Sequence, residues 1–556
     1  MKIALAQINS KVGDLKGNEA LHADAIAEAT RGHAQLVIFP EMSLLGYPPR
    51  DLVGRVGVAQ ACLAAAERLA RSVPASMLVL VGLPIVSQGR PFANAMALLR
   101  GGVIEGYARK QLLPSYDVFD EDRHYQPGAQ TTVVEHAGER VAVLLCEDLW
   151  QAGDVGSVRC YARDPVADAR AQGASLIACA SASPFVAGKH AMHVALLRAR
   201  ARTAGVPVAS VNAVGGQDDL IFDGGSCLVS ARGELLGVCG RFHAGLRFVE
   251  SVPTTHAITD DSANTNFDPD LDTERFHACV LGTRDYLLKS GHSTAIVGLS
   301  GGIDSALVAA IAVAALGPSA VTGIRMPSRY SSQGSLDDAL ESARLLGIGR
   351  LATLPIDALH DAIERSVDGA FSVEGLTGEN LQSRARGLLV MLASNATGAL
   401  VLTTGNKSEY ATGYTTLYGD MNGGLAPIGD LYKTEVYAMA RLLNTRHAEF
   451  GFAHPPIPRA TIEKAPSAEL RPNQTDQDSL PPYETLDAVL RVLVESEGSI
   501  DQAVALSGAS REVVLRVATL LDRSQYKRDQ AAVILKLTAR AFGRGRRHPI
   551  TAGWSW

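Results

Sequence analysis

Residues 300–305, Ser-Gly-Gly-Ile-Asp-Ser, are the part of the sequence whose residue types and spacing best predict chemistry. They follow the apolar run 295–299 and open a helix-like stretch at 306–316, so backbone N–H groups, two hydroxyls and the positive end of a helix surround one small volume. The loop lacks the Gly-Lys-Ser/Thr ending of a Walker loop. A carboxylate such as Asp304 is tolerable beside a polyphosphate chiefly when a divalent cation lies between them. The loop therefore predicts a site for pyrophosphate bound with Mg²⁺.

Three segments in the first half end apolar strands with reactive side chains. They carry Glu41 in Phe-Pro-Glu, Lys110 in residues 107–114, and Cys146 in residues 144–150. A carboxylate, a lysine and a cysteine that meet at strand ends can form a thiolate nucleophile, because a nearby ammonium lowers the thiol pKa while the acid relays a proton. Taken singly, Cys146 could also be a small core residue and Lys110 a surface charge.

Short strands and helices alternate from residue 1 to about 251 and again from about 274, before a proline-rich loop at 453–482 and a final helical region, which predicts an α/β protein. Glycine pairs at 101–102 and an Ala-Arg-Gly turn at 231–233 predict hairpins. We expect one domain at 1–252, a polar linker at 253–272, and a second domain at 273–556 whose first convincing strand carries the phosphate loop. Expected strands lie at 2–8, 34–39, 77–83, 140–145, 174–178 and 206–211, with helices at 20–30 and 60–71.

Length and composition restrict the class of protein. A chain of 556 residues exceeds the roughly 250–300 residues that one hydrophobic core supports. No apolar run approaches the roughly 20 residues of a membrane span, and the seven cysteines include no Cys-x-x-Cys pair, which argues against disulfides and zinc. We expect a cytoplasmic protein without a membrane partner. The net charge of −6 gives no general attraction for nucleic acid, so anionic substrates must be held locally.

The Ser-Gly-Gly-x-Asp-Ser string resembles the signature of the ATP-pyrophosphatase superfamily, whose members cleave ATP between the α- and β-phosphates to activate a carbonyl or carboxylate as an adenylate. Five later strings, at 379–387, 403–409, 413–420, 431–436 and 466–470, together resemble the NAD synthetases. Each string alone could be an ordinary helix start or cap. The resemblance implies a doubly wound, Rossmann-like parallel sheet and an activated nicotinic acid adenine dinucleotide (deamido-NAD).

The NAD synthetase resemblance also implies roles for individual residues. Asp304 and Glu409 would bind Mg²⁺, an assignment that hard-cation chemistry favours independently. The ATP-binding residues would be Gly298, Leu299, Ser300, Gly301, Gly302, Ile303, Asp304, Ser305, Thr404, Lys433 and Ser467. The deamido-NAD contacts would be Asn380, Glu409 and Lys527. Without the resemblance, Lys433 and Lys527 could be solvated surface lysines.

The three reactive segments of the first half together resemble the nitrilase superfamily, which implies a four-layer α-β-β-α sandwich. By this resemblance Glu41 is the general base, Lys110 stabilises the oxyanion, Cys146 forms the thioester and Glu121 orients the lysine. The glutamine-binding positions would be Tyr116, Ser183 and Lys189. Lys189 departs from the arginine expected there, so a single ammonium replaces a guanidinium fork as the expected contact for the glutamine carboxylate.

The two resemblances complement each other, because glutamine hydrolysis releases the ammonia that an adenylate needs. The whole chain is thus similar to the glutamine-dependent NAD synthetases, with ATP, deamido-NAD and glutamine as substrates and a protected ammonia passage as a hypothesis. Competing readings are an adenylating amidotransferase for a purine nucleotide or a tRNA base, and a synthetase whose first half is a non-catalytic module. The family resemblance implies a synthetase-domain dimer, with an octamer as the larger alternative.

Overall fold

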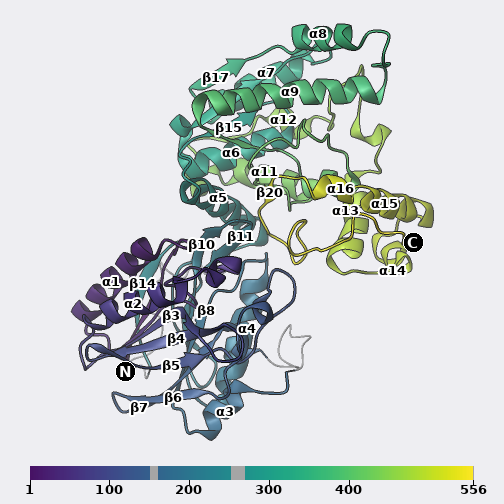
Figure 1. Ribbon diagram of the computed structural model, residues 1–556. Helices are drawn as coiled ribbons and strands as arrows, with labels where there is room; N and C mark the ends of the chain where they lie inside the picture. The colour runs from purple at the N-terminus through teal and green to yellow at the C-terminus, as the bar shows by residue number, and fades with distance from the viewer. Residues whose placement is uncertain (151–160, 252–268, 555) are drawn as a thin grey trace. The chain divides into compact units, whose positions relative to one another are not determined.

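The chain forms two units, which we describe separately (Figure 1). The computed structural model describes residues 1–150, 161–251, 269–554 and 556. The first unit is Met1–Leu271 and the second is Asp272–Trp556. Most of the linker expected at 253–272 lies outside the described residues, and helix α5 (Leu271–Lys289) already includes its last two positions.

Two six-stranded sheets and a hairpin make up the first unit. The first sheet has the order β14-β1-β2-β3-β4-β5, the second β13-β12-β9-β8-β7-β6, and β10 pairs with β11. The strands are β1 (Lys2–Gln7), β2 (Leu36–Ile38), β3 (Leu78–Val86), β4 (Phe92–Arg100), β5 (Val103–Arg109), β6 (Thr132–His136), β7 (Glu139–Leu145), β8 (Leu176–Ser181), β9 (Val208–Asn212), β10 (Val214–Gln217), β11 (Leu220–Asp223), β12 (Cys227–Val229), β13 (Leu235–Val238) and β14 (Gly245–Glu250). The helices are α1 (Leu15–Arg31), α2 (Val58–Ala70), α3 (Pro165–Ala171) and α4 (Lys189–Ala204).

The period-two pattern of the strands sets the layers of this unit. Ile3 of β1 and Val141 of β7 belong to one apolar layer, which lies between the two sheets. The next residues turn the opposite way: Ala4 joins the core under α1 and α2, and Ala142 joins the core under α3 and α4. Helix, sheet, sheet and helix layers follow from this alternation, so the predicted α-β-β-α sandwich is confirmed.

One parallel sheet organises the second unit, in the order β17-β16-β15-β18-β19-β20. Its strands are β15 (Ala295–Gly298), β16 (Val321–Arg325), β17 (Arg350–Thr353), β18 (Leu400–Leu402), β19 (Leu425–Ala426) and β20 (Val533–Ile534). The chain builds outward from β15 to β17, and then continues at β18 on the other side of β15. Such a reversal opens a crevice beyond the carboxyl ends of the two central strands, where ligands bind in sheets of this kind.

Helices cover both faces of the sheet, as predicted for a doubly wound fold. Val390 of α9 packs against Ile296 and Val401 on one face, and α6 lies on the opposite side of β15 (Figure 1). A further group, α13 to α15, has its own core. The helices are α6 (Ile303–Leu316), α7 (Gln333–Leu345), α8 (Asp357–Val367), α9 (Leu376–Thr397), α10 (Lys407–Thr412), α11 (Lys433–Thr445), α12 (Arg459–Glu463), α13 (Tyr483–Leu490), α14 (Ile500–Ser507), α15 (Arg511–Arg523) and α16 (Gln525–Arg528).

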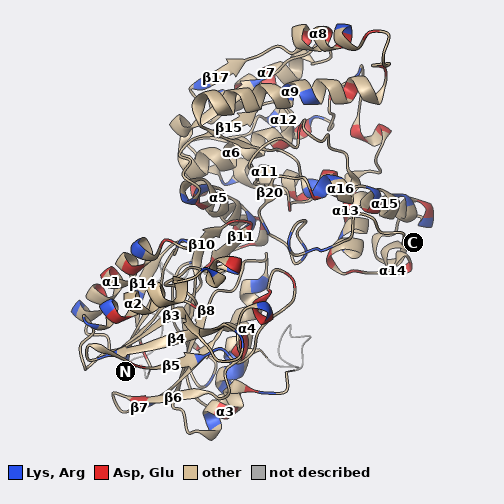
Figure 2. Cartoon of the chain, in the orientation of Figure 1, with Lys and Arg blue, Asp and Glu red and all other residues tan. Residues whose placement is uncertain are grey.

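Acidic and basic residues are mixed along outer helices such as α1 and α15 (Figure 2). This mixture fits the small net charge, so attraction of anionic substrates depends on individual groups. No helix in the described part of the chain has both the length and the apolar character of a membrane span.

Candidate functional site

Three strand ends bring together the reactive residues predicted in the first unit. Glu41 follows β2, Lys110 directly follows β5, and Cys146 directly follows β7. Lys110 Nζ donates to Glu41 Oε1 at 2.7 Å and to Glu121 Oε1 at 2.8 Å. Cys146 is buried with them and within electrostatic reach of Glu41 and Lys110. The fold therefore gathers all four residues, as the sequence predicts.

The turn that carries Cys146 is tied to the segment that carries Lys110. Asp148 accepts hydrogen bonds from the N–H groups of the two residues that follow Lys110, each at 2.9 Å, and from Leu145 N at 3.1 Å. Cys146 itself has a φ of 42°, a left-handed conformation that is unfavourable for a side-chain-bearing residue. A strained residue on a tight turn is typical of a functional site.

The electrostatics of Cys146 differ from the expectation. Burial and the Glu41 carboxylate raise the pKa of the Cys146 thiol, and the lowering effect of Lys110 does not overcome them. Burial alone would lower the pKa of Lys110, but Glu121 and Glu41 outweigh burial and raise it, so the lysine is a firm cation. Burial also raises the pKa of Glu121, against the effect of Lys110. The raised pKa favours the thiol form of Cys146, so the lowering by the Lys110 ammonium that the sequence predicts is outweighed by burial.

Two polar residues that the sequence analysis missed support the carboxylates. Tyr47 OH donates to Glu121 Oε1 at 2.8 Å, and Asn94 Nδ2 donates to Glu41 Oε1 at 2.6 Å. Asn94 lies fully buried within the apolar strand β4. A single amide in an apolar strand predicts a buried hydrogen bond, so the sequence does mark this residue as a candidate. Tyr47 lies in a loop without a comparable signal.

The predicted glutamine-binding residues form two groups. Lys189 Nζ donates to Ser183 Oγ at 2.8 Å, so these two residues are neighbours. Tyr116 instead donates to Glu147, with its hydroxyl 3.1 Å from Oε2, and Tyr161 donates to Glu147 Oε1 at 2.6 Å. Glu147 is buried and immediately follows Cys146, yet the sequence analysis gave it no role. Among the described residues, no lysine or arginine forms an ion pair with Glu147.

In the second unit the phosphate loop joins the end of β15 to α6. Ser300 Oγ lies 3.1 Å from Ser305 Oγ and accepts from Gly302 N at 3.2 Å. Ser305 Oγ also donates to Gly302 O at 2.9 Å. Both hydroxyls and the loop backbone therefore surround one point at the start of the helix, as predicted for a phosphate cradle.

Two carboxylates converge beside this loop. Lys433 Nζ contacts Asp304 Oδ2 at 2.5 Å and Glu409 Oε1 at 3.3 Å, and Asn406 Nδ2 donates to Asp304 Oδ1 at 3.0 Å. Burial raises the pKa of Glu409 despite Lys433. Burial would lower the pKa of Lys433, but Asp304 and Glu409 together raise it. Carboxylate oxygens that already converge on one cation are the donors Mg²⁺ prefers, so the pair fits that ion.

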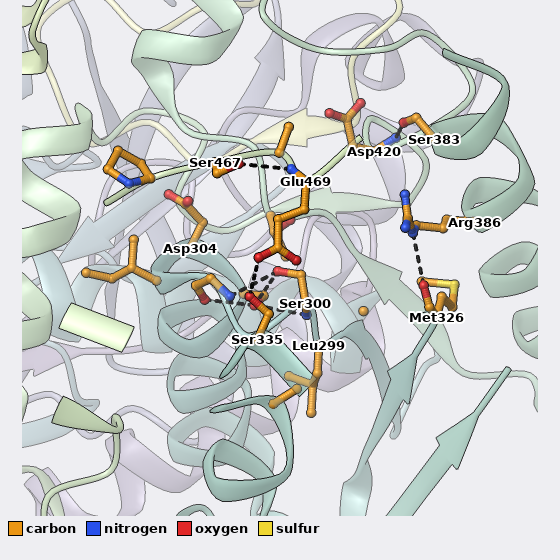
Figure 3. Close-up of a pocket in the computed structure, with 18 of the residues that line it drawn as sticks. Leu299, Ser300, Asp304, Met326, Ser335, Ser383, Arg386, Asp420, Ser467 and Glu469 are labelled. Carbon is orange, nitrogen blue, oxygen red and sulfur yellow. Dashed lines mark hydrogen bonds between the residues drawn. The ribbon is translucent and has the colours of Figure 1, made fainter. Parts of the chain in front are cut away.

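A cavity of about 300 Å³ lies over the phosphate loop (Figure 3). The predicted ATP-binding and metal-binding residues that line it are Gly298, Leu299, Ser300, Gly302, Ile303, Asp304, Ser305, Thr404, Glu409, Lys433 and Ser467. Gly301, Asn380 and Lys527 are not among its lining residues. Lining residues that sequence reasoning missed include Met326, Arg386, Asp420, Lys464 and Glu469. Arg386 and Asp420 lie in the segments 379–387 and 413–420, whose resemblance to the NAD synthetases could have identified them. No sequence pattern marks Met326.

The remaining deamido-NAD candidates contact the string at 413–420. Asn380 Oδ1 accepts from Thr416 Oγ1 at 3.0 Å. Lys527 Nζ donates to the carbonyls of Gly413 at 2.7 Å and Thr415 at 2.6 Å. The two residues thus lie beside the same segment, outside the cavity lining.

Comparison with known proteins assigns both units to families. The carbon-nitrogen hydrolase model matches residues 2–253, and the NAD synthase model matches residues 276–531. The glutamine-dependent NAD(+) synthetase of Synechocystis sp. (strain ATCC 27184 / PCC 6803 / Kazusa) is 42% identical over 99% of this chain and 98% of its own length. The chain belongs to the glutamine-dependent NAD(+) synthetases.

Other glutamine-dependent NAD(+) synthetases agree. That of Xanthomonas campestris pv. campestris (strain 8004) is 43% identical over 100% of this chain and 98% of its own length. The solved enzyme from Acinetobacter baumannii, in complex with ADP, has 34% identity and a TM-score of 0.75, and the match covers 100% of this chain and 99% of that chain. The enzyme from Cytophaga hutchinsonii, at 22% identity and a TM-score of 0.81, has the same fold.

As a glutamine-dependent NAD(+) synthetase, the protein converts deamido-NAD(+) into NAD(+) with ATP and with glutamine as the amide donor. The carbon-nitrogen hydrolase match falls on the unit that holds Cys146, and the NAD synthase match on the unit that holds the phosphate loop. The readings in which the product is a purine nucleotide or a tRNA base are therefore wrong.

Proposed function

We propose that Cys146, Glu41, Lys110 and Glu121 release ammonia from glutamine. The observation that supports this assignment is the Lys110 ammonium held between two buried carboxylates beside the thiol. Because Cys146 rests as a thiol, Glu41 takes its proton while the sulfur attacks the amide carbon. Lys110 stabilises the oxyanion that forms, and Glu121 keeps the lysine charged and oriented.

Collapse of the tetrahedral intermediate expels ammonia with the proton returned by Glu41 and leaves a thioester on Cys146. Glu41 then removes a proton from a water molecule, which attacks the thioester carbon; the C–S bond breaks, glutamate leaves, and Glu41 returns the proton to the Cys146 sulfur. Ser183 and Lys189 would bind the glutamine carboxylate together, since they are already hydrogen-bonded. Tyr116 and Glu147 would bind its α-ammonium, because a buried carboxylate needs a cation.

In the second unit we propose that residues 298–305, Thr404, Lys433 and Ser467 hold the ATP phosphates. Asp304 and Glu409 would hold Mg²⁺, which supplies charge neutralisation for the departing pyrophosphate. The deamido-NAD carboxylate then displaces pyrophosphate from the α-phosphorus, and ammonia displaces AMP from the acyl-adenylate. Asn380, Glu409 and Lys527 would contact the dinucleotide. Catalysis at this site consists of positioning and electrostatic stabilisation.

Ammonia is the shared intermediate, and free ammonia is mostly protonated at neutral pH. We therefore propose a protected passage for it. Labelled ammonium in the medium should be excluded from NAD(+) while glutamine is being consumed, and free entry of label would contradict a passage.

A homodimer of the second unit is proposed on the basis of α9. Its stretch 387–397 carries no charged residue, and Leu388 and Leu392 are 56% and 63% exposed. An exposed apolar helix face of this kind is typical of an interface between copies. We also propose the cytoplasm as the site of action, since the cysteines described, including Cys62 and Cys279, are free thiols.

One assay tests the scheme as a whole. Release of AMP, pyrophosphate and glutamate is followed with deamido-NAD(+) present or withheld. The proposed mechanism requires AMP and pyrophosphate in equal amounts with NAD(+), and no AMP without deamido-NAD(+). Production of ADP and orthophosphate would contradict it.

A further inference from the structure

We propose that Lys464 is a positioning residue that fixes the orientation of the Gly301–Gly302 peptide in the phosphate loop. Lys464 follows α12 and lies 163 positions after Gly301 in the chain. The inference rests on the proposed role of this loop in binding the ATP phosphates. Lys464 thus reaches the loop from a distant segment of the chain.

All three donors of the Lys464 ammonium have partners. Nζ donates to Gly301 O at 3.1 Å, Ser335 Oγ at 2.9 Å and Asp338 Oδ2 at 2.9 Å. A lysine has three N–H donors, so this arrangement uses its full capacity within the protein. Lys464 therefore acts on a phosphate through the loop and not by direct contact.

The contact with Gly301 O determines where the next N–H points. In a trans peptide the C=O and N–H lie in one plane and point in opposite directions. With the carbonyl held by Lys464, the N–H of Gly302 is directed to Ser300 Oγ, at 3.2 Å, on the inner side of the loop. A flip of the peptide would direct the carbonyl oxygen toward the phosphate and repel it.

The Gly301–Gly302 peptide needs an external anchor because glycine backbones rotate readily. Gly301 has a φ of +80°, and a Cβ on it would lie 2.2 Å from Ser335 O. Residues with side chains are thus excluded at the position where they would stiffen the loop. Lys464 supplies the restraint that the glycine lacks.

Residues near both ends of the segment 464–470 contact the first turn of α7. The hydroxyl of Ser335 contacts Lys464 Nζ and donates to Glu469 Oε1 at 2.6 Å, and Ser332 Oγ donates to the same oxygen at 2.8 Å. Glu469 reaches toward Ser335 next to Ser300 (Figure 3). Ser467, which lines the cavity, lies within this segment. The contacts that fix the segment to α7 and to the phosphate loop therefore also fix the position of Ser467.

The test compares two ligands of the full-length enzyme by calorimetric titration: inorganic pyrophosphate with Mg²⁺, and AMP. Lys464→Met retains the length of the side chain but loses its charge and donors. We expect it to weaken pyrophosphate binding about tenfold or more, the usual effect of losing a charge-assisted hydrogen bond, and to leave AMP binding unchanged. Arg459→Met on neighbouring α12, an exposed position, is the matched control and should change neither.

Lys464→Arg keeps the charge and donors, so it should restore most of the pyrophosphate affinity. Should Lys464→Met fail to fold, Lys464→Gln, which also lacks the charge, takes its place with the same expected result. Unchanged pyrophosphate binding in Lys464→Met, or equal weakening of pyrophosphate and AMP, would overturn the proposal. Ser305→Ala tests the phosphate site itself, independently of Lys464. If Ser305→Ala leaves pyrophosphate binding unchanged, the proposed phosphate site itself is wrong.

Discussion

Lys110 Nζ lies 2.7 Å from Glu41 Oε1, so the buried ammonium is in direct contact with the carboxylate proposed as the general base. Asn94 donates to the same oxygen, whereas Oε2 accepts only from Ala182 N, at 3.2 Å, among the described residues. Glu41 therefore has one oxygen fixed by two strong donors and one oxygen with a single, longer contact. The less engaged oxygen is the one suited to exchange protons with the thiol and the leaving ammonia.

Removal of the thiol should separate the two activities. Cys146→Ala is expected to lower glutamine-driven NAD(+) synthesis by about a thousandfold or more, as for loss of a nucleophile, and to leave ammonia-driven synthesis intact. Both rates are measured on one preparation. Cys179→Ala, also a buried cysteine of the first unit, is the matched control and should retain both. Loss of both activities in Cys146→Ala would exclude a two-site scheme, and retention of both would leave the first unit without a catalytic role.

Tyr47 should act by positioning Glu121. Tyr47→Phe removes one of the two donors to Glu121 Oε1, so we expect kcat for glutamine hydrolysis to fall about tenfold, the usual value of one such hydrogen bond, with KM unchanged. Tyr125→Phe is the matched control, because the buried Tyr125 hydroxyl has no hydrogen-bond partner among the residues that the structure describes. Equal losses in the two variants would mean that general packing, and not Glu121, is affected.

Glu147 should determine selectivity for an α-amino group. Glu147→Gln is expected to raise KM for glutamine about tenfold or more, since a charge-assisted contact is lost. The KM for 5-amino-5-oxopentanoate, which has the same amide but no α-amino group, should not change. Steady-state glutaminase assays with both substrates measure this. A similar rise for both substrates would show that Glu147 only holds Tyr116 in place.

The carboxylate pair of the second unit should set the magnesium requirement. Asp304→Asn is expected to lower pyrophosphate release by about a hundredfold, because transition-state charge is then poorly neutralised, and to raise the Mg²⁺ concentration needed for half-maximal rate. Glutamine hydrolysis in the first unit should persist. Asp357→Asn, which alters a partly exposed pair with Arg329, is the control. An unchanged Mg²⁺ titration in Asp304→Asn would contradict the metal assignment.

Acid should destabilise the first unit through His22. Burial lowers the pKa of His22 from 6.5 to about 4, and its ring contacts Asn18 O and Ser43 Oγ, so the folded state holds it neutral. Between these pH values the unfolded chain binds more protons, so stability falls as the pH is lowered, by roughly 3 kcal/mol at pH 4. Calorimetric unfolding of His22→Gln should show a smaller loss between pH 6.5 and 4 than the wild type. The exposed His243→Gln should match the wild type, and an unchanged slope in His22→Gln would contradict the prediction.

Local patterns in the sequence predicted most of the framework. The alternation of apolar and polar residues predicted a strand at 2–8, and β1 ends one residue earlier. The glycine pair at 101–102 joins β4 to β5, as predicted. The helix after the phosphate loop begins at Ile303 and not at residue 306, because the loop closes through hydrogen bonds of Ser300 and Ser305 that permit an earlier start.

Long-range contacts account for what the sequence did not predict. The pKa of Cys146 depends on burial, which overrides the charge of Lys110, and burial is a property of the whole sandwich. Lys464 and Glu147 are ordinary charged residues in the sequence. Only the folded chain shows that one contacts the phosphate loop and the other receives two tyrosine hydroxyls.

The placement of β15 at the centre of its sheet has a consequence during synthesis of the protein on the ribosome. Asp304 meets Asn406, which is 102 residues further along, and Lys433, which is 129 residues further along. A growing polypeptide that has emerged with its glycine-rich loop but without α10 and α11 therefore lacks groups that complete the proposed nucleotide site. The order in which the strands appear therefore delays assembly of this cluster until α11 has been made.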